Sequence, residues 1–236
     1  MKVSPIKTRI FRENENLLDF IISYVKKLKN NSIIVVTSKI VALSEGRVAI
    51  IKDKNTREKI IKAESQFAMR TKYTWLTIKD GMVLASAGID ESNADGKIIM
   101  LPKNSFTSAS LIRKKLMKHY KVKNLGIIIT DSRLLPLRAG VVGIALGYAG
   151  FKGVRDYRGN TDLFGRSLTL SQSDVADSLA TSAVYLMGEG SERQPLALIS
   201  DSKVVFCKKT NVNELKINPK EDIYQPLFEK IRKIKL

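Results

Sequence analysis

Two apolar runs in the second half of the chain constrain the fold most strongly. The first, at residues 126–129, ends abruptly at Thr130-Asp131-Ser132. The second carries glycines at positions 140, 143, 147, 150 and 153. Short apolar runs rich in β-branched residues are typical of buried strands, and repeated glycines let another backbone or a ligand approach closely. The segment therefore predicts two buried strands, the first of which ends with polar groups that face a cleft.

Helix-like and strand-like patterns are mixed along the chain without strict alternation. The 3.6-residue apolar period predicts helices over residues 14–28, 107–120 and 174–187, and less regular helices over 54–70 and 224–234. Strands are predicted over residues 32–36 and 97–101, as a pair within 73–86, and as a closing hairpin of 196–199 with 203–208. This arrangement favours an α+β fold, with mixed sheets and packed helices, over a doubly wound parallel sheet.

The positive charge of the chain does not by itself indicate a nucleic-acid-binding protein. The net charge is +18, but the basic residues are spread through the 236-residue chain, many of them on predicted helices such as Arg113-Lys114-Lys115. No arginine-rich tail, zinc-ligand set or aromatic RNA-binding signature accompanies them. An anionic substrate explains the charge equally well. We therefore expect small-molecule partners rather than nucleic acid.

The chain has the composition of a cytoplasmic protein. Its single cysteine, Cys207, excludes a disulfide framework, and we expect an inert structural thiol. Residues 1–11 lack the apolar segment of a secretory signal, and no apolar run approaches the ~20 residues of a membrane span. We therefore expect no membrane association. The single histidine, His119, excludes a histidine-based triad or zinc site.

Several short segments resemble, in order, those of the coenzyme F420-0:γ-glutamyl ligase (CofE-like) family. They include VTSKIVALSEGR at 36–47, AGIDESN at 87–93, and the glycine-rich segment with its flanks through LMGEG at 186–190. The resemblance implies a ligase that joins the amine of L-glutamate to a carboxylate, using GTP or ATP and Mg²⁺ or Mn²⁺. It also implies an intertwined homodimer. We expect the ligase domain, with interleaved subdomains, over residues 1–203, and a C-terminal strand and helix extension over 204–236.

Asp131 is the main candidate for a metal ligand. It follows a predicted strand, and the matching family aspartate binds metal; an ordinary strand-end turn is the alternative. The resemblance adds Ser132 and Asp90 as metal ligands, and Arg158 and Asp162 as catalytic residues beside Asp131. Carboxylate and hydroxyl oxygens suit Mg²⁺ and Mn²⁺.

The other candidates fall into a nucleotide group and a substrate group. The nucleotide group comprises Ser38, Lys39, Glu45, Gly46, Arg47, Arg138 and Gly140. The substrate group comprises Asp90, Ser92, Asn93, Arg155 and Asp156. Each has an ordinary alternative: a strand end followed by a β-turn at 38–47, an Asx turn at 90–93, and a solvated charged loop at 155–166.

Three positions depart from the family pattern. Phe106 replaces an aspartate expected to bind metal, Leu43 stands where a lysine is common, and Leu135 lies where the family has an arginine-containing segment. Phenylalanine cannot ligate a cation. Two alternatives to an F420-0 ligase therefore stay open. One is a folate-pathway ligase, of dihydrofolate synthase or folylglutamate type, and the other is a non-catalytic nucleotide-binding relative.

Overall fold

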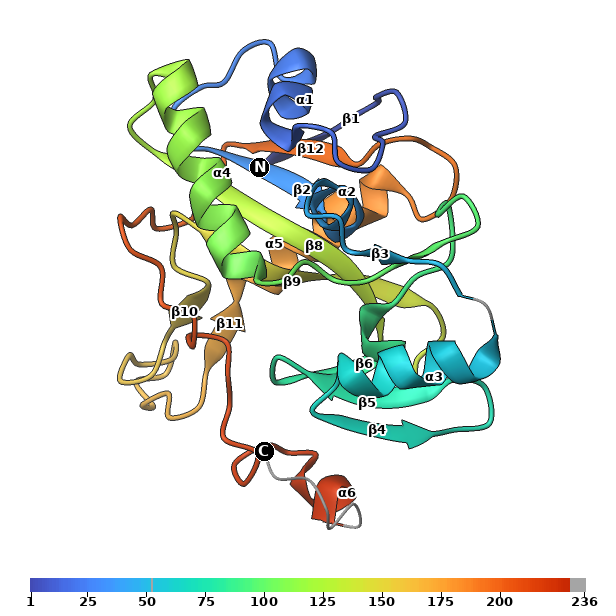
Figure 1. Ribbon diagram of the computed structural model, residues 1–236. Coiled ribbons are helices and arrows are strands. Elements are labelled where there is room, and N and C mark those ends of the chain that lie inside the picture. Colours follow the sequence, from blue (N-terminus) through green and yellow to red (C-terminus); the bar gives the residue numbers. More distant parts are fainter. Residues whose placement is uncertain (52, 230–236) are drawn as a thin grey trace.

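A five-stranded mixed sheet forms the centre of the molecule (Figure 1). The computed structural model describes residues 1–51 and 53–229. The strand order is β1 (Lys2–Ile6), β12 (Leu196–Ser200), β2 (Ser32–Thr37), β8 (Leu125–Leu134) and β9 (Val141–Ala149). Among these neighbours β2 and β8 are parallel, and the other pairs are antiparallel. The mixed sheet with packed helices confirms the α+β class.

Helices cover both faces of this sheet. In Figure 1, α4 (Ser105–Tyr120) crosses the front of β8 and β9, and α5 (Val175–Met187) lies behind them. The alternation of side chains along a strand explains how β8 serves both layers. Ile127 and Ile129 pack with α4 and with α1 (Leu17–Tyr24), whereas Ile128 packs with α5. A strand buried on both faces reads as a continuous apolar run, as the sequence does here.

A smaller unit lies beside the main sheet. It contains α3 (Lys54–Ala63) and the antiparallel strands β4 (Phe67–Arg70), β5 (Trp75–Lys79) and β6 (Met82–Ala85). Ile61, Trp75 and Ile98 form its core. The remaining elements are α2 (Ser38–Ser44), β3 (Val48–Ala49) paired with β7 (Ile98–Ile99), η1 (Ser86–Gly88), β10 (Val154–Asp156) paired with β11 (Gln172–Asp174), and α6 (Gln225–Glu229).

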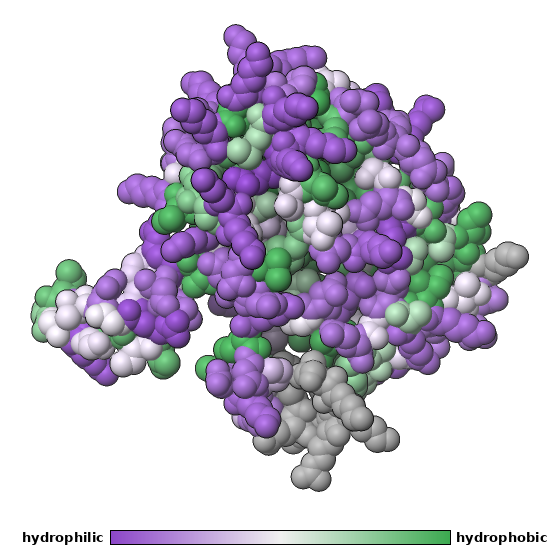
Figure 2. Space-filling view, turned by 60° about the vertical axis from the view of Figure 1, so that its left-hand side comes forward, coloured by the Kyte–Doolittle hydropathy of each residue, from purple (hydrophilic) through white to green (hydrophobic). Residues whose placement is uncertain are grey.

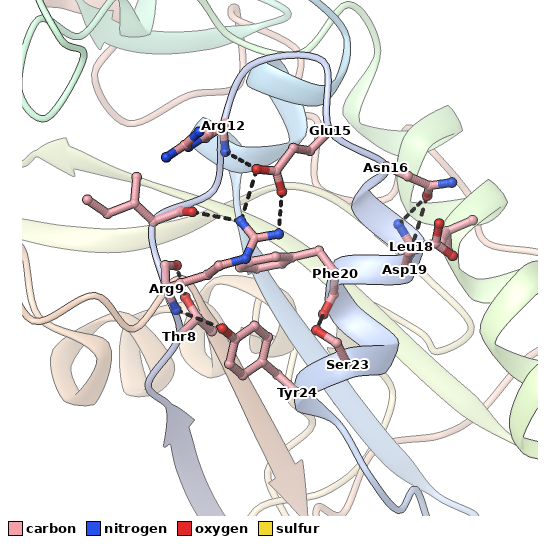
Figure 3. Close-up of polar contacts among 11 residues, drawn as sticks. Thr8, Arg9, Arg12, Glu15, Asn16, Leu18, Asp19, Phe20, Ser23 and Tyr24 are labelled. Carbon is pink, nitrogen blue, oxygen red and sulfur yellow. Dashed lines mark hydrogen bonds and ion pairs between the residues drawn. The ribbon is translucent and has the colours of Figure 1, made fainter.

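Helix α1, at Leu17–Tyr24, is shorter at both ends than the predicted 14–28, and local contacts define where it begins. The Asn16 side chain accepts hydrogen bonds from the backbone N–H groups of Leu18 and Asp19 (Figure 3). Just before it, Arg9 donates to both carboxylate oxygens of Glu15, at 2.9 and 2.7 Å. The Arg9 guanidinium also lies 5.2 Å from the centre of the Phe20 ring. These contacts fix where the chain enters the helix.

Three other predicted elements were wrong in part. The helix predicted over 54–70 ends at Ala63, because residues 67–70 pair with β5 as strand β4. Ser38 begins α2 rather than continuing a strand into a turn.

The hairpin of 196–199 with 203–208 does not form, since β12 pairs with β1 and β2. Of the helix predicted over 224–234, residues 225–229 are helical, and 230–234 lie outside the described residues.

The segment after residue 203 is fastened to the main sheet instead. Phe206 forms an isolated bridge with Phe151, and Arg113 donates to the carbonyl oxygen of Cys207 at 3.2 Å. Farther along, the Glu214 carboxylate accepts from the hydroxyl group of Tyr148, at 2.7 Å. It also accepts from the backbone N–H of Gly153, at 2.7 Å. Tyr148 is fully buried, so its hydroxyl group depends on this partner.

Replacing Glu214 with alanine should therefore destabilise the protein. A buried hydroxyl group left without a partner costs about 2 kcal/mol, which urea unfolding can measure. Glu221→Ala is a suitable control, because Glu221 is exposed. In a double-mutant cycle, Tyr148→Phe should remove most of the Glu214 effect. Additive losses from the two substitutions would contradict the assigned hydrogen bond.

None of the helices within residues 1–51 and 53–229 is both long enough and apolar enough to span a bilayer. Figure 2 shows a mainly hydrophilic surface on one side of the molecule, with hydrophobic residues in separate groups.

Candidate functional site

The parallel pair β2 and β8 brings two predicted site segments to one edge of the sheet. Thr37 and Thr130 are register partners, so the residues that follow them emerge side by side. After Thr37 the chain turns into α2 and presents Lys39. The pairing of β8 with β9 shifts register between Ile129 and Thr130, and β8 then continues through Asp131 and Ser132. Ligand sites commonly form at the carboxyl ends of parallel strands.

The AGIDESN segment joins this edge through Lys39. The Lys39 Nζ atom lies 2.7 Å from Asp90 Oδ2 and donates to the Ser92 carbonyl oxygen at 2.8 Å. Asp90 in turn accepts from the backbone N–H of Ser92 at 2.7 Å and from its hydroxyl group at 2.9 Å. Asn93 donates to the carbonyl oxygen of Gly190 at 3.2 Å. The predicted Asx turn is therefore present, and it also places Asp90 against Lys39.

Asp131 lies in an environment that disfavours its charge. Burial is the main cause, and the nearby carboxylates of Asp90 and Glu189 add to it, so the pKa of Asp131 rises to about 7. The backbone N–H of Ser132 and the Lys39 ammonium group act in the opposite direction. Burial likewise raises the pKa of Glu189, and Asp90 adds to that effect. Perturbed carboxylates of this kind gather at functional sites.

Glu189 is a member of this site that sequence reasoning did not assign. Its carboxylate accepts a hydrogen bond from Ser132 Oγ at 3.4 Å. The one signal in the sequence was an acidic residue between two glycines, immediately after the predicted helix and inside the matched LMGEG segment. We refer to Lys39, Asp90, Asp131, Ser132 and Glu189 together as the strand-end site.

The strand-end site suits a divalent cation in its chemistry. Its donors are oxygens from three carboxylates and a hydroxyl group, which Mg²⁺ and Mn²⁺ prefer. A bound cation would relieve the repulsion from Asp90 and Glu189, which adds to the effect of burial in raising the pKa of Asp131. Within residues 1–51 and 53–229, however, no three acidic, histidine or cysteine side chains are arranged closely enough to enclose a metal unaided. A cation here would depend on Asp131 and Asp90, with waters and phosphate oxygens completing its shell.

The departure at Phe106 has a structural explanation. The Phe106 ring packs edge-on against Tyr148, with ring centres 5.3 Å apart, and belongs to the core between the sheet and α5. Leu43 likewise packs against buried residues of α2 and its neighbours. Leu135 is partly exposed, in the turn between β8 and β9. Phe106 and Leu43 therefore contribute to packing in this chain.

Two predicted nucleotide-binding side chains are engaged within the chain. Glu45 accepts from the Ser108 hydroxyl group at 2.7 Å and from the Lys103 backbone N–H at 2.8 Å. Arg47 donates to Glu64 at 2.7 Å and to the Leu101 carbonyl oxygen at 3.0 Å. Ser38 is buried, Gly46 has a positive φ of 64°, and Arg138 and Gly140 lie in the exposed β8–β9 turn. A role for these residues in nucleotide binding stays a prediction.

The charged segment 155–166 lies at the other end of β8. It follows β9, whose last residue, Ala149, pairs with Ile127 near the start of β8, so β10 and β11 lie away from Asp131 (Figure 1). Arg158 makes a two-pronged contact with Asp156, at 2.6 and 2.9 Å, which lowers the pKa of that aspartate to about 2.

The other two predicted residues of this segment also have partners within it or nearby. Asp162 accepts from the backbone N–H groups of Phe164 and Arg166. Arg155 donates to the Lys203 carbonyl oxygen at 2.7 Å. One chain therefore does not bring these arginines and aspartates to the strand-end site.

The fold and the site together define an α+β protein with an acidic, lysine-containing site where two parallel strands end. Comparison with known proteins identifies it further. The chain belongs to the F420-0:gamma-glutamyl ligase family, whose sequence profile matches residues 5–201. The family resemblance of the sequence motifs is thereby confirmed, and with it the expectation of an amide-forming ligase.

Archaeal proteins are among the similar sequences. The chain is 35% identical over 246 aligned residues to the coenzyme F420:L-glutamate ligase of Methanococcus maripaludis strain C7, covering 95% of this chain and 97% of that protein. It is 28% identical over 242 residues to the enzyme of that name in Archaeoglobus fulgidus, covering 94% and 96%. A shorter match, 44% identical over 128 residues, covers 54% of this chain and 51% of the Methanocaldococcus jannaschii enzyme of that name.

Proposed function

We propose that this chain is a nucleotide-dependent γ-glutamyl ligase for an acceptor of the coenzyme F420-0 type. The observation that carries the proposal is the family match over residues 5–201, which contains every residue of the strand-end site. Relatives that match over nearly their whole length bear the name coenzyme F420:L-glutamate ligase. The perturbed carboxylates beside Lys39 support a site for phosphoryl-transfer chemistry.

The reaction consumes three substrates and joins two of them, the acceptor and L-glutamate, in two steps. A carboxylate oxygen of the acceptor attacks the γ-phosphorus of GTP or ATP, and the nucleoside diphosphate leaves. The amine of L-glutamate then attacks the acyl phosphate, loses a proton and displaces phosphate. Such transfers depend on positioning and on stabilising the charge of the phosphoryl group.

The strand-end site supplies groups for both needs. Asp131, Asp90 and Ser132 would hold Mg²⁺ or Mn²⁺, which when bound neutralises phosphate charge and polarises the phosphoryl group. Lys39 supplies a cation on the same edge of the sheet, now held by Asp90 at 2.7 Å. Glu189 faces Ser132 and would orient its hydroxyl group. Nucleotide and metal are thus expected to bind together rather than independently.

We further propose that the working form is a homodimer. Arg158 and Asp162 lie far along the sheet from Asp131 in one chain, so a second chain would have to bring them to that site. The loop between β10 and β11 also exposes large apolar side chains: Leu163 is 97% exposed, Phe164 94% and Leu170 87%. Exposed apolar side chains gathered on one loop favour a protein interface.

The dimer can be tested by sedimentation at micromolar concentration. A mass of twice the 26.4 kDa chain is expected, and the double variant Leu163→Ser/Phe164→Ser should shift the population towards one chain. A mass of one chain for the unmodified protein would reject the dimer. If the dimer forms, Arg158→Ala should weaken binding of the anionic substrates without changing the melting temperature.

The identity of the acceptor distinguishes an F420-0-type ligase from a folate-type ligase. The purified protein is incubated with GTP or ATP, Mn²⁺ and L-glutamate, together with either an F420-0-type acceptor or dihydropteroate, and the products are identified by mass spectrometry. A glutamylated F420-0-type product is expected. A product from dihydropteroate alone would assign a folate-type ligase. Nucleotide binding without a product from either acceptor would assign a non-catalytic nucleotide-binding relative.

A further inference from the structure

A cavity of about 700 Å³ lies between α3, the residues that connect β4 to β5, and the loop at residues 91–98. This volume is within the range of small-molecule sites. We call it the α3 cavity. It is separate from the strand-end site but shares a loop with it. Asp90 contacts Lys39 in the strand-end site, whereas the next residue, Glu91, lines the α3 cavity.

The lining of the α3 cavity carries more positive than negative side chains. Lys54, Arg57, Arg70 and Lys97 line it, against Glu58 and Glu91. Arg57 forms an ion pair with Glu91, and Lys97 forms one with Glu13, which is outside the lining. Lys54 and Arg70 form no ion pair with a carboxylate of residues 1–51 and 53–227. Two cations of the cavity, Lys54 and Arg70, are therefore not engaged in an ion pair with the described side chains, although Glu58 and Glu91 line the same cavity.

Aromatic side chains complete the chemistry of this cavity. The Arg70 guanidinium carbon lies 5.8 Å from the centre of the Trp75 ring, and Trp75 is buried, so the ring holds the guanidinium in place. Tyr73 lines the cavity and is 83% exposed. An exposed tyrosine ring beside two such cations offers a stacking surface next to an anion site.

We propose that the α3 cavity binds the planar-ring, anionic acceptor of the ligase reaction. Tyr73 stacks on the ring, and Lys54 and Arg70 contact its phosphate or carboxylate groups. The assignment rests on the proposed function, which requires an acceptor with a carboxylate, and on the shared loop, in which Glu91 of the cavity directly follows Asp90 of the strand-end site. The metal and nucleotide take no part in this contact.

Flavin mononucleotide is a suitable probe, because it joins a planar tricyclic ring to a phosphate. Its fluorescence is titrated with the full chain in the absence of nucleotide and metal. Arg70→Gln should weaken binding about tenfold, since it removes a charged hydrogen-bond donor. Tyr73→Ala should weaken it several-fold through the loss of stacking. Melting curves establish that each variant folds.

Lys62→Gln is the matched control. Lys62 lies 4.9 Å from the centre of the same Trp75 ring but does not line the cavity, so this variant should bind the probe as the unmodified protein does. Riboflavin, which lacks the phosphate, should bind more weakly and should not respond to Arg70→Gln. Equal binding of the two flavins, or equal effects of Arg70→Gln and Lys62→Gln, would overturn the proposal.

A kinetic experiment connects the cavity to the reaction. In the ligation assay, flavin mononucleotide should compete with the acceptor and not with GTP or ATP. Inhibition that excess acceptor does not relieve would overturn the assignment of the cavity to the acceptor. If the protein does not ligate even when no flavin is present, that result contradicts only the proposed function. The binding titrations test independently whether the cavity binds a planar anion.

Discussion

Replacement of Asp131 with asparagine is expected to lower the ligation rate about 1,000-fold, as loss of a central charged group at a phosphoryl-transfer site does. Asparagine keeps the shape of the side chain and removes the charge that would hold the cation. Calorimetry should show that nucleotide affinity of the variant no longer responds to Mn²⁺. Asp80→Asn, in the exposed β5–β6 turn, is the control and should leave both properties unchanged. Metal-dependent nucleotide binding that survives in Asp131→Asn would contradict the assignment.

The same variant should be more stable than the unmodified protein at alkaline pH. The pKa of Asp131 rises in the folded state from 3.8 to about 7, so the folded chain binds this proton more tightly than the unfolded chain does. Its contribution to stability is therefore fully present below pH 4 and is lost as pH rises to about 7. Asparagine does not ionise, and metal-free Asp131→Asn should gain about 4 kcal/mol at pH 8 relative to its difference at pH 4. A difference that does not change with pH would contradict the described environment.

Gly147→Ala is expected to lower the stability of the protein by about 3 kcal/mol. A Cβ atom at Gly147 would lie 2.5 Å from the backbone carbon of Ser105 and 2.6 Å from the backbone nitrogen of Phe106. These atoms belong to the first turn of α4, which cannot yield as a flexible side chain would. The helix would have to move away from β9, opening the core around Tyr148.

Gly159→Ala provides the comparison for this substitution. Gly159 has a φ of 82°, and no atom lies within 4 Å of the place where a methyl group would stand. Alanine there meets only backbone strain, at about 1 kcal/mol. Denaturant unfolding of both variants measures the difference. Equal losses would mean that close approach of α4 to β9 is not what requires glycine at 147.

The close backbone approach expected from the repeated glycines is confirmed at Gly143 and Gly147 in β9, and at Gly150 after it. The two buried strands are confirmed as well, because a continuous apolar run reports burial on both faces. The helix predicted over 107–120 is confirmed to within two residues, as α4, which is capped by the Asn104 side chain. These strands, glycines and helices could be predicted because each depends on residues that are close in sequence or on the small size of one residue.

The features that the sequence did not predict depend on distant partners. Residues 67–70 form a strand because β5 offers an edge, and residues 203–208 form none because β12 is already paired on both sides. Glu189 reaches Ser132 across 57 residues because α5 returns along the sheet to the end of β8. No local sequence pattern indicates that the chain returns to β8 in this way. Glu189 was therefore noticed only as part of the LMGEG segment that resembles the family.

The most direct measurement of the proposed ligation follows an oxygen atom. The acceptor carboxylate is labelled with oxygen-18 and converted with GTP or ATP, L-glutamate and Mn²⁺. If the carboxylate attacks the γ-phosphorus, its oxygen stays with phosphorus when the amine displaces it. We predict one labelled oxygen in inorganic phosphate for every glutamyl amide formed. Label in a nucleoside monophosphate, or amide formation with no label in phosphate, would contradict the account.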